Sequence, residues 1–102
     1  MKRHYPIHYL ATAEHDLQEL FDYLLYHAPA RVNRFLNKID RTIVRLAKFP
    51  FSGTIPRDKR LAEKGYRMLV IGDYLVFYRL KRSRVVIHRI LHGRRRYHFL
   101  FG

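Results

Sequence analysis

The chain contains no cysteine, and this absence excludes several kinds of chemistry. Without cysteine there is no disulfide framework, no thiolate metal site and no cysteine nucleophile, so the sequence is compatible with a reducing compartment. Long apolar runs are also missing. The polar N-terminus leaves no signal-peptide core, and no segment approaches the length needed to span a membrane. We therefore expect a cytoplasmic protein without membrane contact.

Two further absences concern cofactors. No glycine-rich loop of the kind that cradles phosphates is visible, so nucleotide-dependent activity has no support. Of the seven histidines, His88 and His92 have the i, i+4 spacing of a zinc ligand pair on a helix. On a strand they would lie about 13 Å apart, at roughly 3.3 Å per residue, too far to share one ion. With no cysteine and no acid nearby, we expect neither a catalytic metal site nor a cofactor.

Acidic residues are few, and the resulting positive charge is the strongest compositional feature. There are 8 Asp and Glu residues and 21 Lys and Arg residues, which gives a formal net charge of +13. A field of that size attracts nucleic acid, anionic membranes or an acidic protein partner. Residues 64–96 contain ten of the basic residues and the single acid Asp73, whereas four acids gather between residues 14 and 22. The basic pole is therefore mainly C-terminal.

The length and the apolar content fit one compact domain over residues 1–102. The chain is 48% hydrophobic, with 8 Tyr and 7 Phe, which is enough to close one core without a metal or a disulfide. Residues 6–10 combine β-branched and aromatic side chains and predict a first strand, with Pro6 favouring its start or a sheet edge. Thr12 is the expected N-cap of the helix that follows, because apolar residues then recur at spacings of three and four up to His27.

A second helix is predicted from Pro29, because Ala28 and Pro29 break the first helix and proline is favoured in a first helical turn. Its apolar residues also recur at helical spacing, which predicts two helices packed as a hairpin. The opposite face of this helix carries a cationic stripe, which consists of Arg31, Arg34, Lys38, Arg41, Arg45 and Lys48. A solvated face is the plainer interpretation of this stripe, and a ligand surface is the alternative.

Three further strands are predicted in the second half of the chain. The break at residues 49–53 ends the second helix, and residues 54–64 form a polar connection without a clear period, a candidate mobile loop. Residues 66–71, 74–80 and 85–91 are rich in β-branched and aromatic side chains and are joined by short turns, which predicts an antiparallel meander. The order strand, two helices, three strands predicts an α+β fold with the helices packed on one face of the sheet.

Four short stretches, in this order, carry a resemblance to a known family. They are Ala13-Glu14-His15-Asp16-Leu17, Phe49-Pro50-Phe51-Ser52-Gly53, Tyr74-Leu75-Val76-Phe77-Tyr78 and Ile87-His88-Arg89-Ile90-Leu91-His92-Gly93-Arg94-Arg95. Through them the chain resembles the RelE/ParE superfamily of toxins from bacterial toxin–antitoxin pairs, over residues 7–97. The resemblance implies the same α+β fold with a helical hairpin and a final meander. It also implies a cognate antitoxin that wraps the toxin with an acidic or amphipathic segment.

The resemblance further implies candidate catalytic residues. RNA-cutting members carry a patch of Lys, Arg, His and Tyr on the sheet and after the last strand, and Arg67, Arg95 and Tyr97 correspond to it by position. Metal-free RNA cleavage needs a base, an acid and cations that stabilise the phosphorane. Arg67 and Arg95 would stabilise charge, His92 is the candidate acid or base, and Tyr97 would supply a phenol or stack on a base. An ordinary surface role for His92 and a packing role for Tyr97 are the alternatives.

Further basic residues are candidate contacts for nucleic acid or for an acidic antitoxin segment, and the sequence does not choose between these two partners. They are Lys64, Arg79, Arg89, Arg94 and Arg96. The arginines at 94–96 directly follow the glycine of the family motif. The facing of Arg79 and Arg89 depends on the register of their strands.

Three functions fit the sequence. The first is a metal-independent, ribosome-dependent mRNA endoribonuclease that inhibits translation in a plasmid-stabilisation system, with ribosome and mRNA as partners; His92, Arg95 and Tyr97 favour it. The second is a ParE-like inhibitor of DNA gyrase without nuclease activity. Leu69 and Leu75 favour this one, because RNA-cutting members often have cations at these positions. The third is a basic nucleic-acid-binding module without toxicity. We expect the first.

Overall fold

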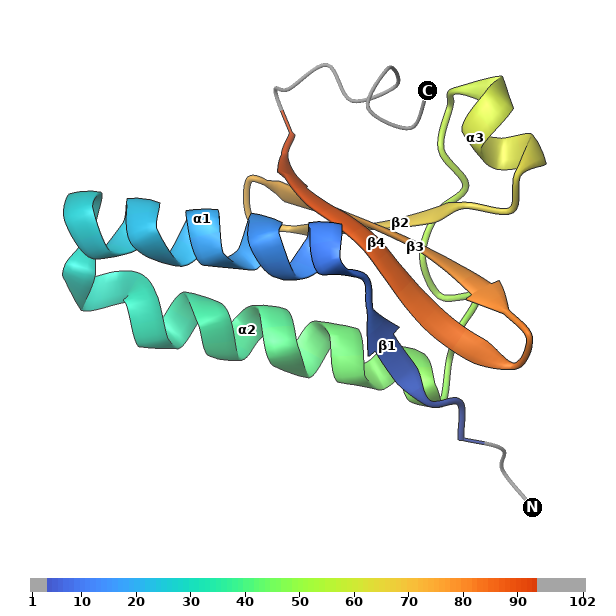
Figure 1. The fold of residues 1–102 in the computed structure, drawn as a ribbon, viewed down its shortest axis with the longest axis horizontal. Helices are drawn as coiled ribbons and strands as arrows, with labels where there is room; N and C mark the ends of the chain where they lie inside the picture. The colour runs from blue at the N-terminus through green and yellow to red at the C-terminus, as the bar shows by residue number, and fades with distance from the viewer. Residues whose placement is uncertain (1–3, 94–102) are drawn as a thin grey trace.

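The computed structural model describes residues 4–93, which form a four-stranded sheet with two long helices on one face (Figure 1). The elements in chain order are β1 (Ile7–Tyr9), α1 (Ala11–His27), α2 (Val32–Val44), α3 (Lys59–Glu63), β2 (Arg67–Ile71), β3 (Tyr74–Lys81) and β4 (Arg84–His92). The sheet order is β1-β4-β3-β2. β1 is parallel to β4 at one edge, and the other neighbours are antiparallel. The predicted α+β fold is confirmed, as is the edge position of the first strand.

Successive side chains along each strand point to opposite faces of the sheet, and the buried ones form two apolar clusters, one on each face. The larger cluster lies under α1 and α2 and includes Val76 of β3 and Ile87 of β4, both fully buried. The smaller cluster, on the opposite face, is formed by Leu61, Tyr66, Phe77 and Leu91. Burial of apolar area at about 25 cal/mol per Å² makes these two clusters the main stabilising contribution of the fold.

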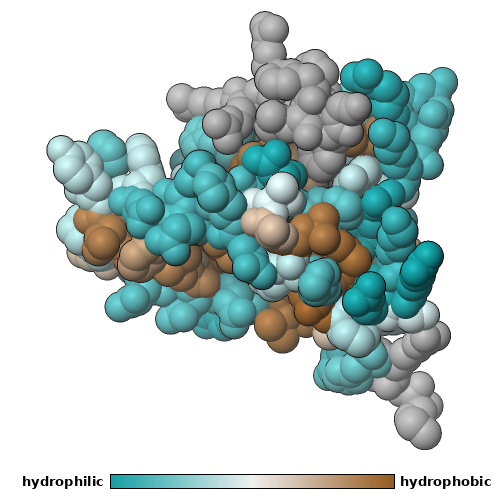
Figure 2. Space-filling view, viewed as in Figure 1, coloured by the Kyte–Doolittle hydropathy of each residue, from teal (hydrophilic) through white to brown (hydrophobic). Residues whose placement is uncertain are grey.

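Both long helices form where the apolar spacing predicts them. α1 ends at His27, and the 3-10 turn Pro29–Arg31 leads into α2. All six cations of the predicted stripe on the second helix are exposed. Figure 2 shows apolar side chains along the seam between the two helices, with hydrophilic side chains on both sides of it. Among residues 4–93, no helix combines the length and the apolarity that crossing a membrane requires.

The connection between α2 and β2 holds more structure than its polar sequence predicts. It contains α3, and the Asp58 carboxylate caps this helix by accepting hydrogen bonds from the backbone N–H groups of Arg60 and Leu61. Leu61 is 2% exposed and anchors α3 on the face opposite to the long helices. Thr54 pairs with Met68 at the edge of β2. The expectation of a segment without helix or strand over residues 54–64 is wrong for the part that forms α3. A single buried leucine among charged residues gives no periodic signal from which this helix could be predicted.

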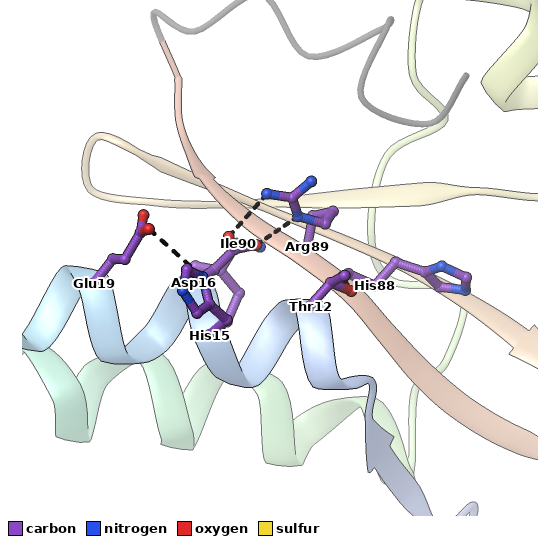
Figure 3. Close-up of polar contacts among 7 residues, drawn as sticks. All are labelled: Thr12, His15, Asp16, Glu19, His88, Arg89 and Ile90. Atoms are coloured by element: carbon purple, nitrogen blue, oxygen red, sulfur yellow. Dashed lines mark hydrogen bonds and ion pairs between the residues drawn. The ribbon is translucent and has the colours of Figure 1, made fainter.

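The outer edge of β4 is covered first by a strand and then by a helix. β1 pairs with Val85–Ile87 only, and the Leu10 N–H donates to the Ile87 carbonyl at 3.0 Å. Beyond this point the Thr12 hydroxyl donates to the His88 carbonyl at 2.9 Å (Figure 3). The prediction of Thr12 as an N-cap is therefore wrong, and α1 has no side-chain cap at its start. The hydroxyl instead satisfies a backbone group that the short β1 leaves unpaired.

Asp16 completes this edge and is the one buried charged residue in the described part of the chain, at 5% exposed. Its carboxylate accepts hydrogen bonds from Arg89 Nε at 2.7 Å, Arg89 Nη2 at 2.9 Å and the Ile90 N–H at 2.9 Å (Figure 3). The Arg89 side chain is 20% exposed. Two charge-assisted bonds and one backbone bond compensate for the removal of both charged groups from water. α1 is thereby tied to the central part of β4.

Asp16→Asn is expected to lower the free energy of unfolding by about 3 kcal/mol, because the Arg89 guanidinium stays partly buried without its counter-charge. Urea denaturation would measure the loss. The matched control is Glu19→Gln, which removes an exposed carboxylate that lies 3.5 Å from His15 on the same helix. This control should change stability by no more than about 0.5 kcal/mol. A similar effect of the two substitutions would show that the Asp16 contact does not stabilise the fold.

Candidate functional site

The structure separates the predicted catalytic residues that it describes. Arg67 begins β2 opposite Tyr78, whereas His92 ends β4 opposite Tyr74. These two positions are four residues apart along β3, which is about 13 Å at roughly 3.3 Å per residue. Four more predicted site residues lie outside the described range, namely Arg94, Arg95, Arg96 and Tyr97. Residues 4–93 therefore do not assemble the predicted catalytic set.

Arg67 holds a loop in place. Its Nη1 donates to the Phe51 carbonyl at 3.1 Å and to the Gly53 carbonyl at 3.0 Å. The guanidinium carbon lies 5.0 Å from the centre of the Phe51 ring. The same loop is fixed from the sheet, because the Gly53 N–H donates to Tyr78 Oη at 2.9 Å. A Cβ at Gly53 would lie 2.6 Å from that oxygen, so this close approach requires glycine.

Leu69 and Leu75, the apolar residues at positions where RNA-cutting relatives often have cations, are packed into the two clusters. Leu69 packs against the larger cluster under the helices, and Leu75 packs against the smaller one. They therefore lie on opposite faces of the sheet. Each contributes to a core, and neither presents a polar group to a ligand.

His92 lies among aromatic and acidic residues. Its ring packs edge-on against Tyr74, with 5.4 Å between the ring centroids. Both side chains border two adjoining depressions of about 350 and 390 Å³ between the helices and the sheet. Asp16 and Glu19 line the first of these depressions. Asp73 and Arg31 line the second, so the described surroundings of His92 hold both carboxylates and a cation.

A compact cluster of Tyr66, Arg79 and His88 lies on the face of the sheet away from the long helices. Arg79 Nε donates to His88 Nε2 at 3.3 Å, and Arg79 Nη1 donates to the carbonyl of Lys64 at 3.3 Å. The Arg79 guanidinium carbon is 4.7 Å from the centre of the Tyr66 ring. The Tyr66 hydroxyl is 3.2 Å from His88 Nδ1. Arg79 and Lys64 were predicted as ligand contacts from the sequence, whereas Tyr66 and His88 were not.

A β-bulge explains why His88 was missed. Tyr78 pairs with Ile87 and Phe77 pairs with Arg89, so His88 is an extra residue in β4. A bulge shifts the alternation of the side chains that follow it. In consequence His88 reaches Arg79 on one face while Arg89 turns to Asp16 of α1. Arg89, a predicted ligand contact, is therefore engaged in an internal ion pair.

The electrostatics of the cluster depend on its burial. Partial burial, with Arg79 and Lys81 nearby, lowers the pKa of His88 to about 4. Burial raises the pKa of Tyr66, against the opposing effect of Arg79. At neutral pH His88 is thus an uncharged acceptor for Arg79, whose positive charge is held by an imidazole, a carbonyl and an aromatic ring. No group of three His, Asp or Glu side chains suited to a metal ion occurs within residues 4–93.

The lowered pKa of His88 predicts a loss of stability in acid. Histidine in the unfolded chain titrates near 6.5, so between about pH 6.5 and about pH 4 the unfolded state binds more protons than the folded state. Stability therefore falls as the pH drops through this range. His88→Gln should reduce the difference in unfolding free energy between about pH 7 and about pH 4.5 by about 1 kcal/mol, allowing for solvent screening of a half-buried group.

Denaturation curves at the two pH values would test this prediction. The control is His15→Gln, which removes an exposed imidazole of α1, and His88→Gln should change the pH dependence more than this control does. An unchanged pH dependence in His88→Gln would contradict the assigned environment of His88.

Comparison with known proteins identifies the fold and the family. Residues 7–97 match the family model for the ParE toxin of the type II toxin–antitoxin system parDE. A search of curated proteins finds no match. The fold is similar to a chain of the chromosomal ParDE toxin–antitoxin system from P. aeruginosa, with a TM-score of 0.73, 17% identity, and coverage of 86% of this chain and 95% of that chain.

Two further solved structures share the fold. One is a chain of the toxin–antitoxin complex RelBE2 from Mycobacterium tuberculosis, with a TM-score of 0.60, 24% identity, and coverage of 87% of this chain and 98% of that chain. The other is a chain of the E. coli DinJ–YafQ toxin–antitoxin complex, with a TM-score of 0.58, 17% identity and full coverage of both chains, 100% each. The family model covers most of the sequence and the described fold agrees with it: the chain belongs to the ParE family of toxins of type II toxin–antitoxin systems.

Proposed function

We propose that this toxin acts by binding DNA gyrase and that it does not cut RNA. The observation that carries this proposal concerns three strand positions at which RNA-cutting relatives often have basic residues. Arg67 is bound to the carbonyls of a loop, and Leu69 and Leu75 are packed into the two apolar clusters. Inhibition through protein binding needs none of these groups. Membership of the ParE family supports the same mode of action.

The proposed partner in the cell is a cognate antitoxin. Solved structures with this fold come from toxin–antitoxin systems and complexes. The chain carries a net charge of +13, so the toxin attracts an acidic antitoxin segment electrostatically. An antitoxin that covers this basic surface would also block access to the target.

Ribosome-dependent mRNA cleavage is the second candidate. The Tyr66, Arg79 and His88 cluster favours it, because it combines a cation with an imidazole and a phenol on one face. A pKa of about 4 makes His88 a weak base at neutral pH, whereas effective general bases have pKa values near the working pH. This mismatch ranks cleavage below gyrase binding.

Purified toxin is expected to inhibit supercoiling of relaxed plasmid by DNA gyrase and to accumulate cleaved plasmid bound to gyrase. Addition of the cognate antitoxin should reverse both effects. Primer extension on mRNA from ribosomes programmed in vitro, mixed with the same protein, should show no new ends. New ends at the ribosomal A site, with gyrase unaffected, would replace the proposal by the second candidate.

Two substitutions outside residues 4–93 separate the candidates in cells. Tyr97→Phe removes one hydroxyl, so a gyrase-binding toxin should still arrest growth, whereas a nuclease that uses this phenol should lose toxicity. Arg95→Ala should also abolish toxicity in a nuclease while antitoxin binding is retained. Growth after induction, with co-purification of the antitoxin as a folding control, would measure both. Loss of toxicity in both variants would count against gyrase binding.

A further inference from the structure

One end of the sheet carries a cationic surface that the proposed function does not use. A depression of about 460 Å³ on the face away from α1 and α2 is lined by four Lys and Arg side chains, two histidines and the apolar residues Leu10 and Val86. We call this surface the hairpin face and define it by His8, Arg79, Lys81, Arg82, Arg84 and His88. No acidic residue lines the depression. Figure 2 shows hydrophilic side chains gathered over this end of the β3–β4 hairpin.

The hairpin face places like charges close together. Lys81 and Arg84 are direct cross-strand partners at the last pair before the turn. Like charges directly opposite each other in a sheet destabilise it. The turn itself contains Arg82 and Ser83 with φ of 51° and 62°, a left-handed conformation that hairpins normally assign to Asn and Gly. Local stability would favour other residues here, and such conflicts are concentrated at functional sites.

The floor of the hairpin face is rigid. Arg79 is fixed by His88, by the Lys64 carbonyl and by the Tyr66 ring. Within residues 4–93 its guanidinium lies in no ion pair with a carboxylate, so its charge is not neutralised internally. A cation held in this way is arranged for an anion before that anion arrives, which lowers the entropy lost on binding.

We propose that the hairpin face binds the phosphate backbone of double-stranded nucleic acid without regard to sequence. Arg79 and Lys81 lie two residues apart on one strand, about 7 Å, and the neighbouring strand lies about 4.8 Å away. This spacing of cations suits a polyanion with regularly repeated charges. The proposal does not rest on gyrase binding, because it concerns a different ligand and a surface defined by its own residues.

Two features of the hairpin face favour a nucleic-acid duplex over a protein segment or a single strand. An amphipathic antitoxin segment needs exposed apolar pockets for its anchors. The large exposed apolar residues of the described chain lie elsewhere, on α1, at the end of α2, in the loop after it and at the β2 edge, and none lines this face. Single strands are held by stacking on exposed aromatic rings, whereas Tyr66 is 7% exposed beneath Arg79. Backbone contact with a duplex fits both features.

Fluorescence anisotropy with a labelled DNA duplex of arbitrary sequence would test the proposal on the full chain. The variant Lys81→Gln/Arg84→Gln removes two exposed charges and relieves their mutual repulsion, so its thermal midpoint should not fall. The matched control Arg34→Gln/Arg41→Gln removes two exposed charges from the stripe on α2. The hairpin variant should bind about ten-fold more weakly than the control, and its slope of log K against log salt should be smaller by about 2.

Each other outcome would overturn the proposal. Equal weakening in the two variants would mean that only net charge attracts DNA. Tighter binding of a single-stranded RNA with the same number of phosphates would mean that the ligand is recognised through its bases. Unchanged DNA binding with weaker binding of the antitoxin's acidic segment would assign the face to a protein partner. The assay contains no gyrase, so its result is independent of whether the supercoiling experiment succeeds.

Discussion

The buried carboxylate of Asp16 is the contact on which the arrangement of the domain depends. A carboxylate with 5% exposure is stable only if its oxygens find donors, and Arg89 and Ile90 of β4 supply three of them. This need places the first turns of α1 against the edge of β4 just beyond the end of β1. Because α2 packs beside α1, the position of the helical hairpin over the sheet follows from the same contact.

The same contact divides the cations of the sheet between two roles. Arg89 turns to α1 at the bulge and is neutralised there, whereas Arg79 and the residues near the turn face the other side without acids. The helical face therefore uses charge to hold elements together. On the opposite face the positive charge has no acidic partner in the depression, as the proposed nucleic-acid site requires, although Lys81 and Arg84 repel each other there. One strand, β4, supplies residues to both roles.

Periodicity in the sequence predicted most of the fold, because apolar spacing directly reports which residues face a core. The helical hairpin and the meander follow from it, and the order of four motifs led to the family. Three local features escaped prediction for physical reasons. α3 is anchored by one buried residue, Leu61. The Thr12 hydroxyl donates to a carbonyl of β4 that lies 76 residues away in the sequence. The bulge at His88 leaves no signal in the amino-acid composition. Each depends on a tertiary contact.

The candidate site was harder to predict, because correspondence of position does not preserve a role. Arg67 matches a basic residue of RNA-cutting relatives, yet its guanidinium meets two carbonyls and the ring of Phe51. That role depends on Gly53, whose lack of a side chain lets the loop approach Tyr78 closely enough for both contacts to form. An arginine that closes a loop in this way loses conformational freedom, and its Nη1 is already bound to two carbonyls. The loop contact and the apolar strand positions therefore support the same conclusion, a toxin that acts by binding.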